Sequence, residues 1–126
     1  MVGLSVPPSD WAAYRYSQVA WAKANIPPSS KPSILDIGSG NGTLSIALCE
    51  AGYNAETMLG IDYSPHSVKL AQAVAKHRLG KDTLKFETCD LLNEDPPVYD
   101  GMNAGVERWD LLCVDHALYP VQRVRG

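Results

Sequence analysis

The segment SILDIGSGNG, residues 33–42, places a short apolar run directly before an aspartate and three alternating glycines. The run has the length of one buried strand, and the residues after the glycines have the apolar spacing of a helix. Glycine permits backbone conformations and close approaches that a Cβ atom would block. A strand that passes through such a turn into a helix predicts a ligand-binding loop at the carboxyl end of a parallel strand.

The rest of the chain alternates between extended and helical patterns. The expected strands lie at residues 32–37, 57–62, 83–90 and 108–114, and the expected helices lie at about 10–24, 42–52 and 64–80. Prolines end the first helix, Ser64 caps the third, and a long acidic loop at 91–107 precedes the last strand. This order predicts an α/β fold, in which crossover helices join the strands of a parallel sheet.

Length and composition restrict the function classes. The 126 residues are the length of one domain, which we expect over residues 1–126 with a loose amino terminus at 1–9. A net charge of -3 gives no broad basic field, so we expect no nucleic-acid partner. No long apolar run predicts a membrane span, and no secretion signal is recognisable. Cys49, Cys89 and Cys113 fit neither a disulfide framework nor a zinc site, which indicates reduced thiols in a cytoplasmic protein.

The spacing of the glycines distinguishes two kinds of nucleotide ligand. A dinucleotide-binding loop, G-x-G-x-x-G, needs glycine at position 43, where this chain has Thr43. Here the glycines are Gly38, Gly40 and Gly42, preceded by Asp36. This G-x-G-x-G form resembles the first motif of class I methyltransferases, which use S-adenosylmethionine. Taken alone, such a turn is also compatible with a purely structural role.

Acidic residues at the ends of the next two predicted strands favour a nucleoside ligand. Asp62, 20 residues after Gly42, can accept hydrogen bonds from both hydroxyls of a ribose. Asp90 can accept from the exocyclic amine of adenine. Each has a structural alternative, since Asp62 could cap the helix near Ser64 and Asp90 could be a turn residue. Suitable residues at three successive strand ends together predict an S-adenosylmethionine site.

Longer motifs carry a more specific resemblance. ILDIGSGNGTLSIALCEAGY, LGIDYSPHSVKLAQAV and CDLLN resemble the protein-lysine methyltransferases that modify translation elongation factor 1-alpha. WAKANIPPSSKPSILDIG is similar to the leading helix and Ile-Pro turn of that family, and the resemblance covers about residues 10–113. It implies a Rossmann-like class I fold, S-adenosyl-L-methionine as cofactor, elongation factor 1-alpha as protein partner and methyl transfer to a lysine amine.

The resemblance also implies a set of cofactor-binding residues. They are Asp36, Gly38, Ser39, Gly40, Gly42, Asp62, Tyr63, Cys89, Asp90 and Leu91. Gly38, Ser39 and Gly40 would line the methionine moiety, with Asp36 orienting the glycine turn at residues 38–42 or meeting the cofactor's ammonium group. Asp62 would hold the ribose, Tyr63 would lie beside the adenine, and residues 89–91 would form the adenine edge. No catalytic side chain is assigned, because methyl transfer mainly requires alignment of the amine with the methyl group.

The chain departs from this family after the fourth predicted strand. The family continues with an aspartate and KGT, whereas this chain has VDHALYPVQRVRG. Asp115 falls one position late, and no regular pattern surrounds His116 and Tyr119. We therefore expect a divergent tail at residues 114–126 and an incomplete sheet, with about four of the seven strands of the class I fold. The fourth strand would then be an unpaired edge.

Three functions are compatible with these observations. The first is a protein-lysine methyltransferase of which this chain is the cofactor-binding half. The second is a catalytically inactive truncated isoform or remnant that retains only that half. The third is a small-molecule methyltransferase, because the residues that read the substrate usually lie beyond the fourth strand. A nicotinamide dehydrogenase is disfavoured by Thr43.

Overall fold

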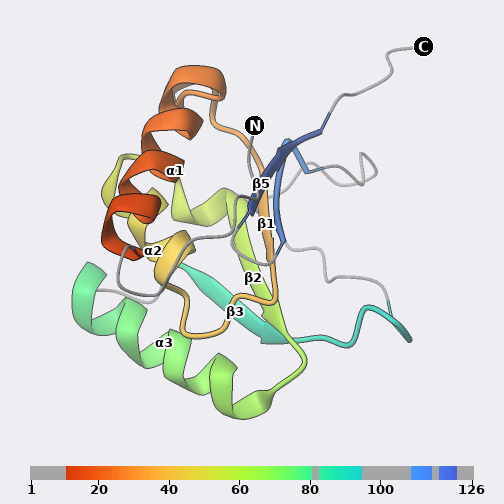
Figure 1. Ribbon diagram of the computed structural model, residues 1–126. Helices are drawn as coiled ribbons and strands as arrows, with labels where there is room; N and C mark the ends of the chain where they lie inside the picture. The colour runs from red at the N-terminus through yellow and green to blue at the C-terminus, as the bar shows by residue number, and fades with distance from the viewer. Residues whose placement is uncertain (1–10, 81–82, 95–108, 115–116, 122–126) are drawn as a thin grey trace.

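A computed structural model describes residues 11–80, 83–94, 109–114 and 117–121 (Figure 1). The helices are α1 (Trp11–Asn25), α2 (Thr43–Glu50) and α3 (Pro65–Leu79), and the strands are β1 (Ile34–Ile37), β2 (Met58–Asp62), β3 (Lys85–Thr88), β4 (Leu111–Val114) and β5 (Ala117–Pro120). The predicted α/β fold is confirmed, and the three helices and first four strands lie where the sequence predicts them. The amino terminus at 1–9, which the sequence predicts to be loose, falls outside the described residues, as do most of the predicted acidic loop, Asp115 and His116.

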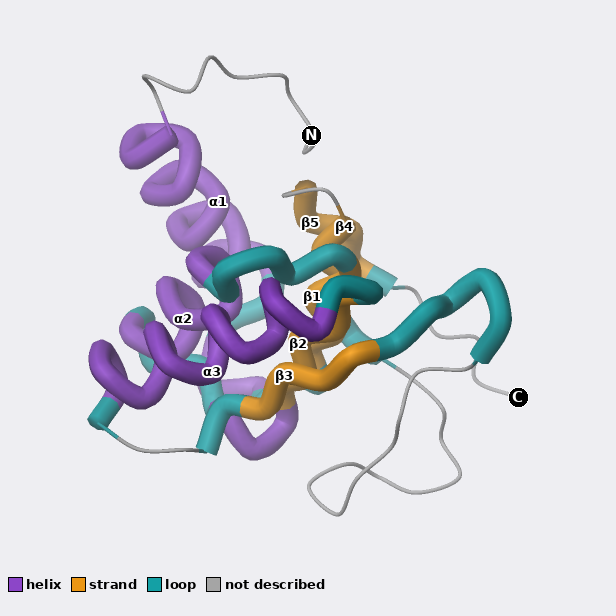
Figure 2. The backbone as a smooth tube through the Cα atoms, turned by 90° about the horizontal axis from the view of Figure 1, so that it is seen from below, coloured by secondary structure: helices purple, strands orange, loops and turns teal. Residues whose placement is uncertain are grey.

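The sheet has the strand order β3-β2-β1-β4-β5, and its first four strands are parallel. Because parallel neighbours all end at the same edge, the turns that follow β1, β2 and β3 are brought together there. Figures 1 and 2 show α1, α2 and α3 on one side of the sheet. This arrangement places the glycine turn, which joins β1 to α2, at the carboxyl edge of the sheet.

Alternation along the strands divides the core into two clusters. One cluster lies between the sheet and the helices and contains Ile34, Met58 and Phe86. The other lies on the opposite face and is formed by strand residues such as Leu35 and Leu59. None of the helices in the described part of the chain is both long enough and apolar enough to cross a membrane.

Local signals in the sequence set the ends of α3. The Ser64 hydroxyl accepts from the backbone N–H of Ser67 at 3.3 Å, and Pro65 occupies the first turn. Gly80 ends the helix with a φ of 75°, in the left-handed region that favours glycine. Both ends match the capping pattern that the sequence predicts.

The carboxyl-terminal segment corrects two expectations. Residues 117–120, within the segment predicted to diverge from the family, form β5, which pairs antiparallel with β4 and places Leu118 opposite Cys113. The sheet therefore has five strands, and β4 is paired on both sides. Only two residues separate β4 from β5, and such a short connection permits antiparallel but not parallel pairing. Tyr119 lies on β5 and is about half-exposed.

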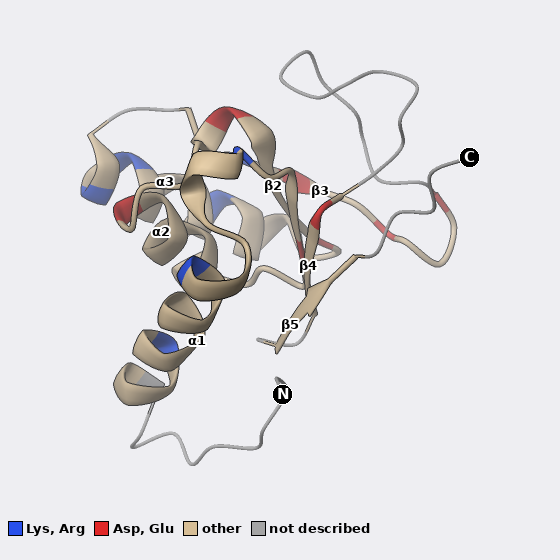
Figure 3. Cartoon of the chain, turned by 90° about the horizontal axis from the view of Figure 1, so that it is seen from above, with Lys and Arg blue, Asp and Glu red and all other residues tan. Residues whose placement is uncertain are grey.

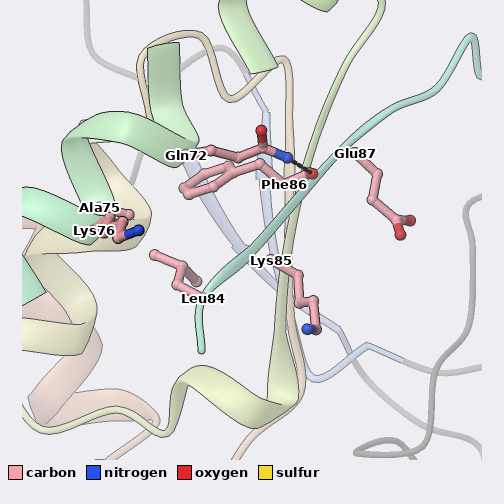
Figure 4. Close-up of a pocket in the computed structure, with 7 residues that line it drawn as sticks. All are labelled: Gln72, Ala75, Lys76, Leu84, Lys85, Phe86 and Glu87. Atoms are coloured by element: carbon pink, nitrogen blue, oxygen red, sulfur yellow. Dashed lines mark hydrogen bonds between the residues drawn. The ribbon is translucent and has the colours of Figure 1, made fainter. Parts of the chain in front are cut away.

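The edge strand β3 is held against α3 by a side chain. Gln72 Nε2 donates to the backbone oxygen of Phe86 at 3.1 Å (Figure 4). Beside this hydrogen bond lies a cavity of about 430 Å³, whose lining includes Lys76, Lys85 and Glu87. This cavity shares no lining residue with the cavity at the glycine turn described below.

Candidate functional site

A cavity of about 440 Å³ opens at the carboxyl ends of β1, β2 and β3. Its lining consists of the last residues of these strands and the turns that follow them. The lining residues are Ile37, Gly38, Ile61, Asp62, Tyr63, Cys89, Asp90, Leu91 and Leu92. Six of the ten residues predicted from the sequence are in this set. The remaining four, Asp36, Ser39, Gly40 and Gly42, belong to the end of β1 and the glycine turn.

The glycine turn is fastened to the end of β2 by its backbone. The N–H groups of Gly38 and Ser39 both donate to the Ile61 carbonyl, each at 2.9 Å. Gly38 and Gly40 have φ values of 69° and 56°, and a Cβ atom built at either position would meet nothing within 4 Å. These two glycines therefore present bare backbone to open space, where a ligand can approach.

Gly42 has a different, structural reason to lack a side chain. Its φ is 80°, and an added Cβ would lie 2.7 Å from Cζ of Phe86 and 3.2 Å from Cβ of Ala71. The last glycine of the motif therefore allows the turn to pack against β3 and α3. The structural role that the sequence leaves open therefore applies to Gly42, while Gly38 and Gly40 face open space.

The carboxylate of Asp62 joins two turns at the mouth of the cavity. Its Oδ2 accepts from the backbone N–H of Gly40 at 3.0 Å, and its Oδ1 accepts from that of Ser64 at 2.9 Å. The structural alternative for Asp62 is thus present, because the carboxylate binds the chain at the start of α3. A carboxylate offers about four lone-pair directions. Two backbone donors leave room for further donors from a ligand.

Asp90 makes a local turn. Its Oδ1 accepts from the backbone N–H of Leu92 at 3.1 Å, and its Oδ2 accepts from Nδ2 of Asn93 at 2.6 Å. Glu94 completes the turn by accepting from the N–H of Asp90 at 2.8 Å. In Figure 3 the loop that follows β3 contains acidic segments. The turn role predicted as the alternative is therefore present, while Asp90 also lines the cavity.

The walls of the cavity are largely apolar. Cys89 and Ile61 are buried, whereas Tyr63 and Leu92 are 80% and 94% exposed at its mouth. Ile61, Ile37 and Leu92 are the lining residues that the sequence did not indicate, because polar groups at strand ends are the more visible signal. The period-two alternation puts the side chains of residues 37 and 61 on the sheet face opposite the helices, and this signal could have found them.

Asp36 lies in β1, two residues before the glycine turn, and is not among the residues that line the cavity. Its side chain is buried, and Oδ2 accepts from the hydroxyl of Ser45 on α2 at 2.9 Å. Burial raises the pKa of Asp36 to about 7, and the nearby Asp62 carboxylate also raises it. The Ser45 hydrogen bond and the Arg15 guanidinium oppose this rise in pKa. The Asp36 contact is with the helix that begins at the turn, which agrees with a role in orienting that turn.

Ser39 carries a buried hydroxyl inside the glycine turn. The residue is 4% exposed, and Oγ has no hydrogen-bond partner within the described ranges. A buried polar atom without a partner costs free energy, on the order of 1–3 kcal/mol. Such an atom is common where a ligand or water completes the site.

Comparison with known proteins identifies similar domains and relatives. Residues 28–123 match the family model described as "Methyltransferase domain". The human "EEF1A lysine methyltransferase 2" is 38% identical over 61 residues, which are 48% of this chain and 25% of that protein. The Saccharomyces cerevisiae "Protein-lysine N-methyltransferase EFM4" is 34% identical over 74 residues, which are 57% of this chain and 32% of that protein. The chain spans about a quarter to a third of the length of these curated relatives.

Solved structures share the fold. Magnesium protoporphyrin IX methyltransferase (ChlM) from Synechocystis, with bound SAH, superposes with a TM-score of 0.61 and 27% identity. The match covers 90% of this chain and 48% of that one. An RNA methyltransferase from Salinibacter ruber, in complex with S-adenosyl-L-homocysteine, superposes with a TM-score of 0.53 and 24% identity. This match covers 73% of this chain and 54% of the RNA methyltransferase. The second likeness concerns the fold alone.

Proposed function

Since the chain belongs to the methyltransferase domain family, whose model matches residues 28–123, we propose that it binds S-adenosyl-L-methionine and forms the cofactor-binding half of a methyltransferase. The observation that carries the proposal is the hydrogen bond from the Gly40 N–H to the Asp62 carboxylate, which joins the glycine turn to the end of β2. This contact joins the glycine turn, in which Gly38 lines the cavity, to the carboxylate of Asp62, which also lines it and which we propose accepts from the ribose hydroxyls.

The residues present fit this cofactor in size and in chemistry. A cavity of about 440 Å³ lies within the usual size range of small-molecule sites, roughly 300–1,000 Å³. Asp62 retains acceptor capacity after binding two backbone donors, and a ribose offers two neighbouring hydroxyl donors. The apolar walls suit the faces of an adenine ring, and the open faces of Gly38 and Gly40 suit the methionine end.

The proposed roles follow from these positions. Gly38, Ser39 and Gly40 hold the methionine moiety. Asp36 orients the turn by accepting a hydrogen bond from Ser45 on α2, the helix that begins at the turn. Asp62 binds the ribose. Gly42 packs the turn against Phe86 and Ala71. The residues proposed to lie around the adenine are Tyr63, Cys89, Asp90 and Leu91.

When bound, this cofactor supplies a methyl group on a positively charged sulfur, from which a nucleophile can take it. The residues of this chain bind the cofactor and orient it, since the ligand itself carries the leaving group. A site of this kind acts chiefly by alignment, and correct alignment can lower a barrier by roughly 7–11 kcal/mol.

For the acceptor we propose a lysine of elongation factor 1-alpha, a cytoplasmic substrate. The similarity to protein-lysine methyltransferases of yeast and human supports this choice, at 34% and 38% identity over the matched region. The match covers only 32% and 25% of those proteins, so methyl transfer by this chain is part of the proposal. A small-molecule methyltransferase is the second candidate, which the superposition on the porphyrin enzyme supports.

Calorimetric titration with S-adenosylmethionine and S-adenosylhomocysteine tests the cofactor. We expect both to bind, and Asp62→Ala to weaken binding at least about tenfold, because it removes the ribose acceptor and the Gly40 contact. Glu56→Ala is the matched control. Glu56 is exposed and lies just before the first residue of β2, whereas Asp62 is the last residue of that strand. Absence of binding by folded wild-type protein would overturn the proposal.

Methyl transfer separates the remaining alternatives. The chain is incubated with methyl-labelled cofactor and either purified elongation factor 1-alpha or magnesium protoporphyrin IX. Label on a lysine of the elongation factor supports the first candidate, and label on the porphyrin supports the second. Cofactor binding without transfer to either one identifies the chain as a non-catalytic half.

A further inference from the structure

The aromatic ring of Phe86 lies beside the last glycine of the turn at residues 38–42. Figure 4 shows this ring extending from β3 toward α3. A Cβ atom added at Gly42 would lie 2.7 Å from Cζ and 3.0 Å from Cε1 of the ring, and 3.2 Å from Cβ of Ala71. The ring therefore fills the space that a side chain at position 42 would need.

A second glycine makes room for the same ring. Gly60, in the middle of β2, pairs with Phe86 in the register of the two strands. A Cβ atom added at Gly60 would lie 2.5 Å from Cδ1 and 2.7 Å from Cε1 of Phe86, and 3.1 Å from Cβ of Ser39. Gly60 is not among the glycines with a positive φ, so its missing side chain serves packing. The ring and the Ser39 side chain share the space that Gly60 leaves.

The ring is held in place by the elements around it. Phe86 is 2% exposed and belongs to the core cluster between the sheet and the helices. Its backbone oxygen accepts from Nε2 of Gln72 on α3 at 3.1 Å, and β3 pairs with β2. Because closely packed interiors transmit displacements between neighbouring groups, a ring fixed in this way also restrains the turn beside it.

The residues of the turn near the ring are bonded to the part that faces open space. The Gly42 N–H donates to the Ser39 carbonyl at 2.9 Å. Gly40, between them in the sequence, donates its N–H to Oδ2 of Asp62 at 3.0 Å and presents bare backbone to open space. A displacement of Gly42 or Ser39 would therefore move the backbone to which we assign the methionine end of the cofactor.

We propose that Phe86 is a positioning residue of the cofactor site, whose ring holds the glycine turn in the shape that receives the cofactor. The inference rests on the proposed function, because the site that it serves is the proposed S-adenosylmethionine site. Phe86 is not among the residues that line the cavity at the turn. It acts through Gly42, and the inference requires no contact between the ring and the cofactor.

The direct test is amide hydrogen exchange of Gly40 and Gly42, measured by NMR in ligand-free protein. Rates are divided by those of the slowest amides of β1 and β2, which report global unfolding. We expect Phe86→Ala to speed the exchange of both glycines at least about tenfold, because the turn loses its packing support and opens locally. Phe86→Leu, which keeps part of the apolar volume, should have a smaller effect.

Leu84→Ala is the matched control. Leu84 is 5% exposed and belongs to the same core cluster as Phe86, yet it is not among the nearest atoms to a Cβ added at Gly42 or Gly60. We expect it to lower global stability and to leave the divided exchange rates within about twofold of those of the wild type. If circular dichroism shows that Phe86→Ala does not fold, Phe86→Leu is compared with Leu84→Ala and carries the same expectation in direction.

A second readout is the affinity for S-adenosylhomocysteine, measured by titration calorimetry at a temperature where all variants are folded. Phe86→Ala should weaken binding at least about tenfold, and Leu84→Ala by less than about twofold. A residue that only stabilises the core would lower the thermal midpoint without this selective loss of affinity in folded protein.

The outcomes distinguish this inference from the proposed function. Unchanged exchange of Gly40 and Gly42 in folded Phe86→Ala overturns the positioning role, and so does equal acceleration in Leu84→Ala. Faster exchange with unchanged affinity overturns the connection between the ring and the cofactor. Wild-type protein that binds no S-adenosylhomocysteine overturns the proposed function, whereas the exchange rates still decide whether Phe86 holds the turn.

Discussion

The backbone N–H of Gly40 donates to Oδ2 of Asp62 at 3.0 Å, and this hydrogen bond connects the turn after β1 to the end of β2. Oδ1 of the same carboxylate accepts from Ser64 N at 2.9 Å, at the start of α3. One side chain therefore connects two turns. The residues in contact, Gly40 and Asp62, are 22 positions apart in the sequence. Substitution of the Asp62 carboxylate should therefore change both the stability of the domain and its affinity for the ligand.

Asp62→Asn should separate these two influences. An amide provides one acceptor oxygen in place of two, so one of the two backbone donors loses its partner, at a cost of about 1–3 kcal/mol. We expect a lower thermal midpoint and, in titration calorimetry, affinity for S-adenosylhomocysteine reduced at least about tenfold. Unchanged values for both would contradict the assigned role, and Glu56→Gln serves as the control.

Gly42→Ala and Gly40→Ala should differ sharply in stability. The new Cβ at position 42 would lie 2.7 Å from Cζ of Phe86, whereas at position 40 it would meet nothing within 4 Å. The backbone has a positive φ at both positions. We expect a loss of about 2–5 kcal/mol for Gly42→Ala, from overpacking and backbone strain, and about 1–2 kcal/mol for Gly40→Ala. Urea denaturation measures both values.

A double variant checks the cause of the larger loss. Phe86→Leu should recover part of the stability of Gly42→Ala, because it removes the ring atoms nearest the added methyl group. Gly40→Ala should instead show its main effect in ligand binding. Similar losses in the two glycine variants, with no recovery by Phe86→Leu, would argue against the packing explanation.

The pKa of Asp36, raised from 3.8 to about 7, gives stability a pH dependence of known sign. Between these values the folded state binds a proton that the unfolded state has released, so this group's contribution is greatest below pH 3.8 and is lost as the pH rises to about 7. A difference of one pH unit between the folded and unfolded pKa values corresponds to about 1.4 kcal/mol of stability. The free energy of unfolding of Asp36→Asn should lack this decline, and parallel curves for the two proteins across the window would contradict the raised pKa.

Leu118→Ala tests whether β5 belongs to the folded domain. Leu118 is fully buried beside the helical side of the sheet, and removing such a side chain costs about 2–5 kcal/mol. Tyr119→Ala is the control on the same strand, because that residue is about half-exposed and its truncation should cost less stability than that of the fully buried Leu118. Equal and small effects would mean that β5 contributes little to the core.

The parts of the fold that the sequence predicts are those with strong local signals. The helix α3 has a capping serine, a first-turn proline and a terminal glycine, and each lies where its local chemistry requires. The strands β1 and β2 are buried apolar runs. Asp36 lies within β1, and Asp62 ends β2. In contrast, β5 has four residues and no local signal, and its pairing is set by the preceding strand.

The site was predicted less completely than the fold, for a similar reason. The cavity lining includes six of the expected residues, since strand ends in a parallel sheet can be located from the sequence. The position of Phe86 beside Gly42 could not be predicted, because it depends on how β3 and α3 pack against the glycine turn. The turn contacts of Asp90 were foreseen only as an alternative, because a turn aspartate and a ligand-binding aspartate have the same local sequence.

The hydrogen bond from Gln72 to Phe86 has a consequence for self-association. An edge strand such as β3 offers backbone carbonyls that a foreign strand can use to extend the sheet. The carbonyl of Phe86 already accepts from Gln72, so a strand arriving there must first displace a side chain that α3 holds in place. At the position of Phe86, a residue of α3 thus occupies an acceptor that a strand from another chain would need for pairing.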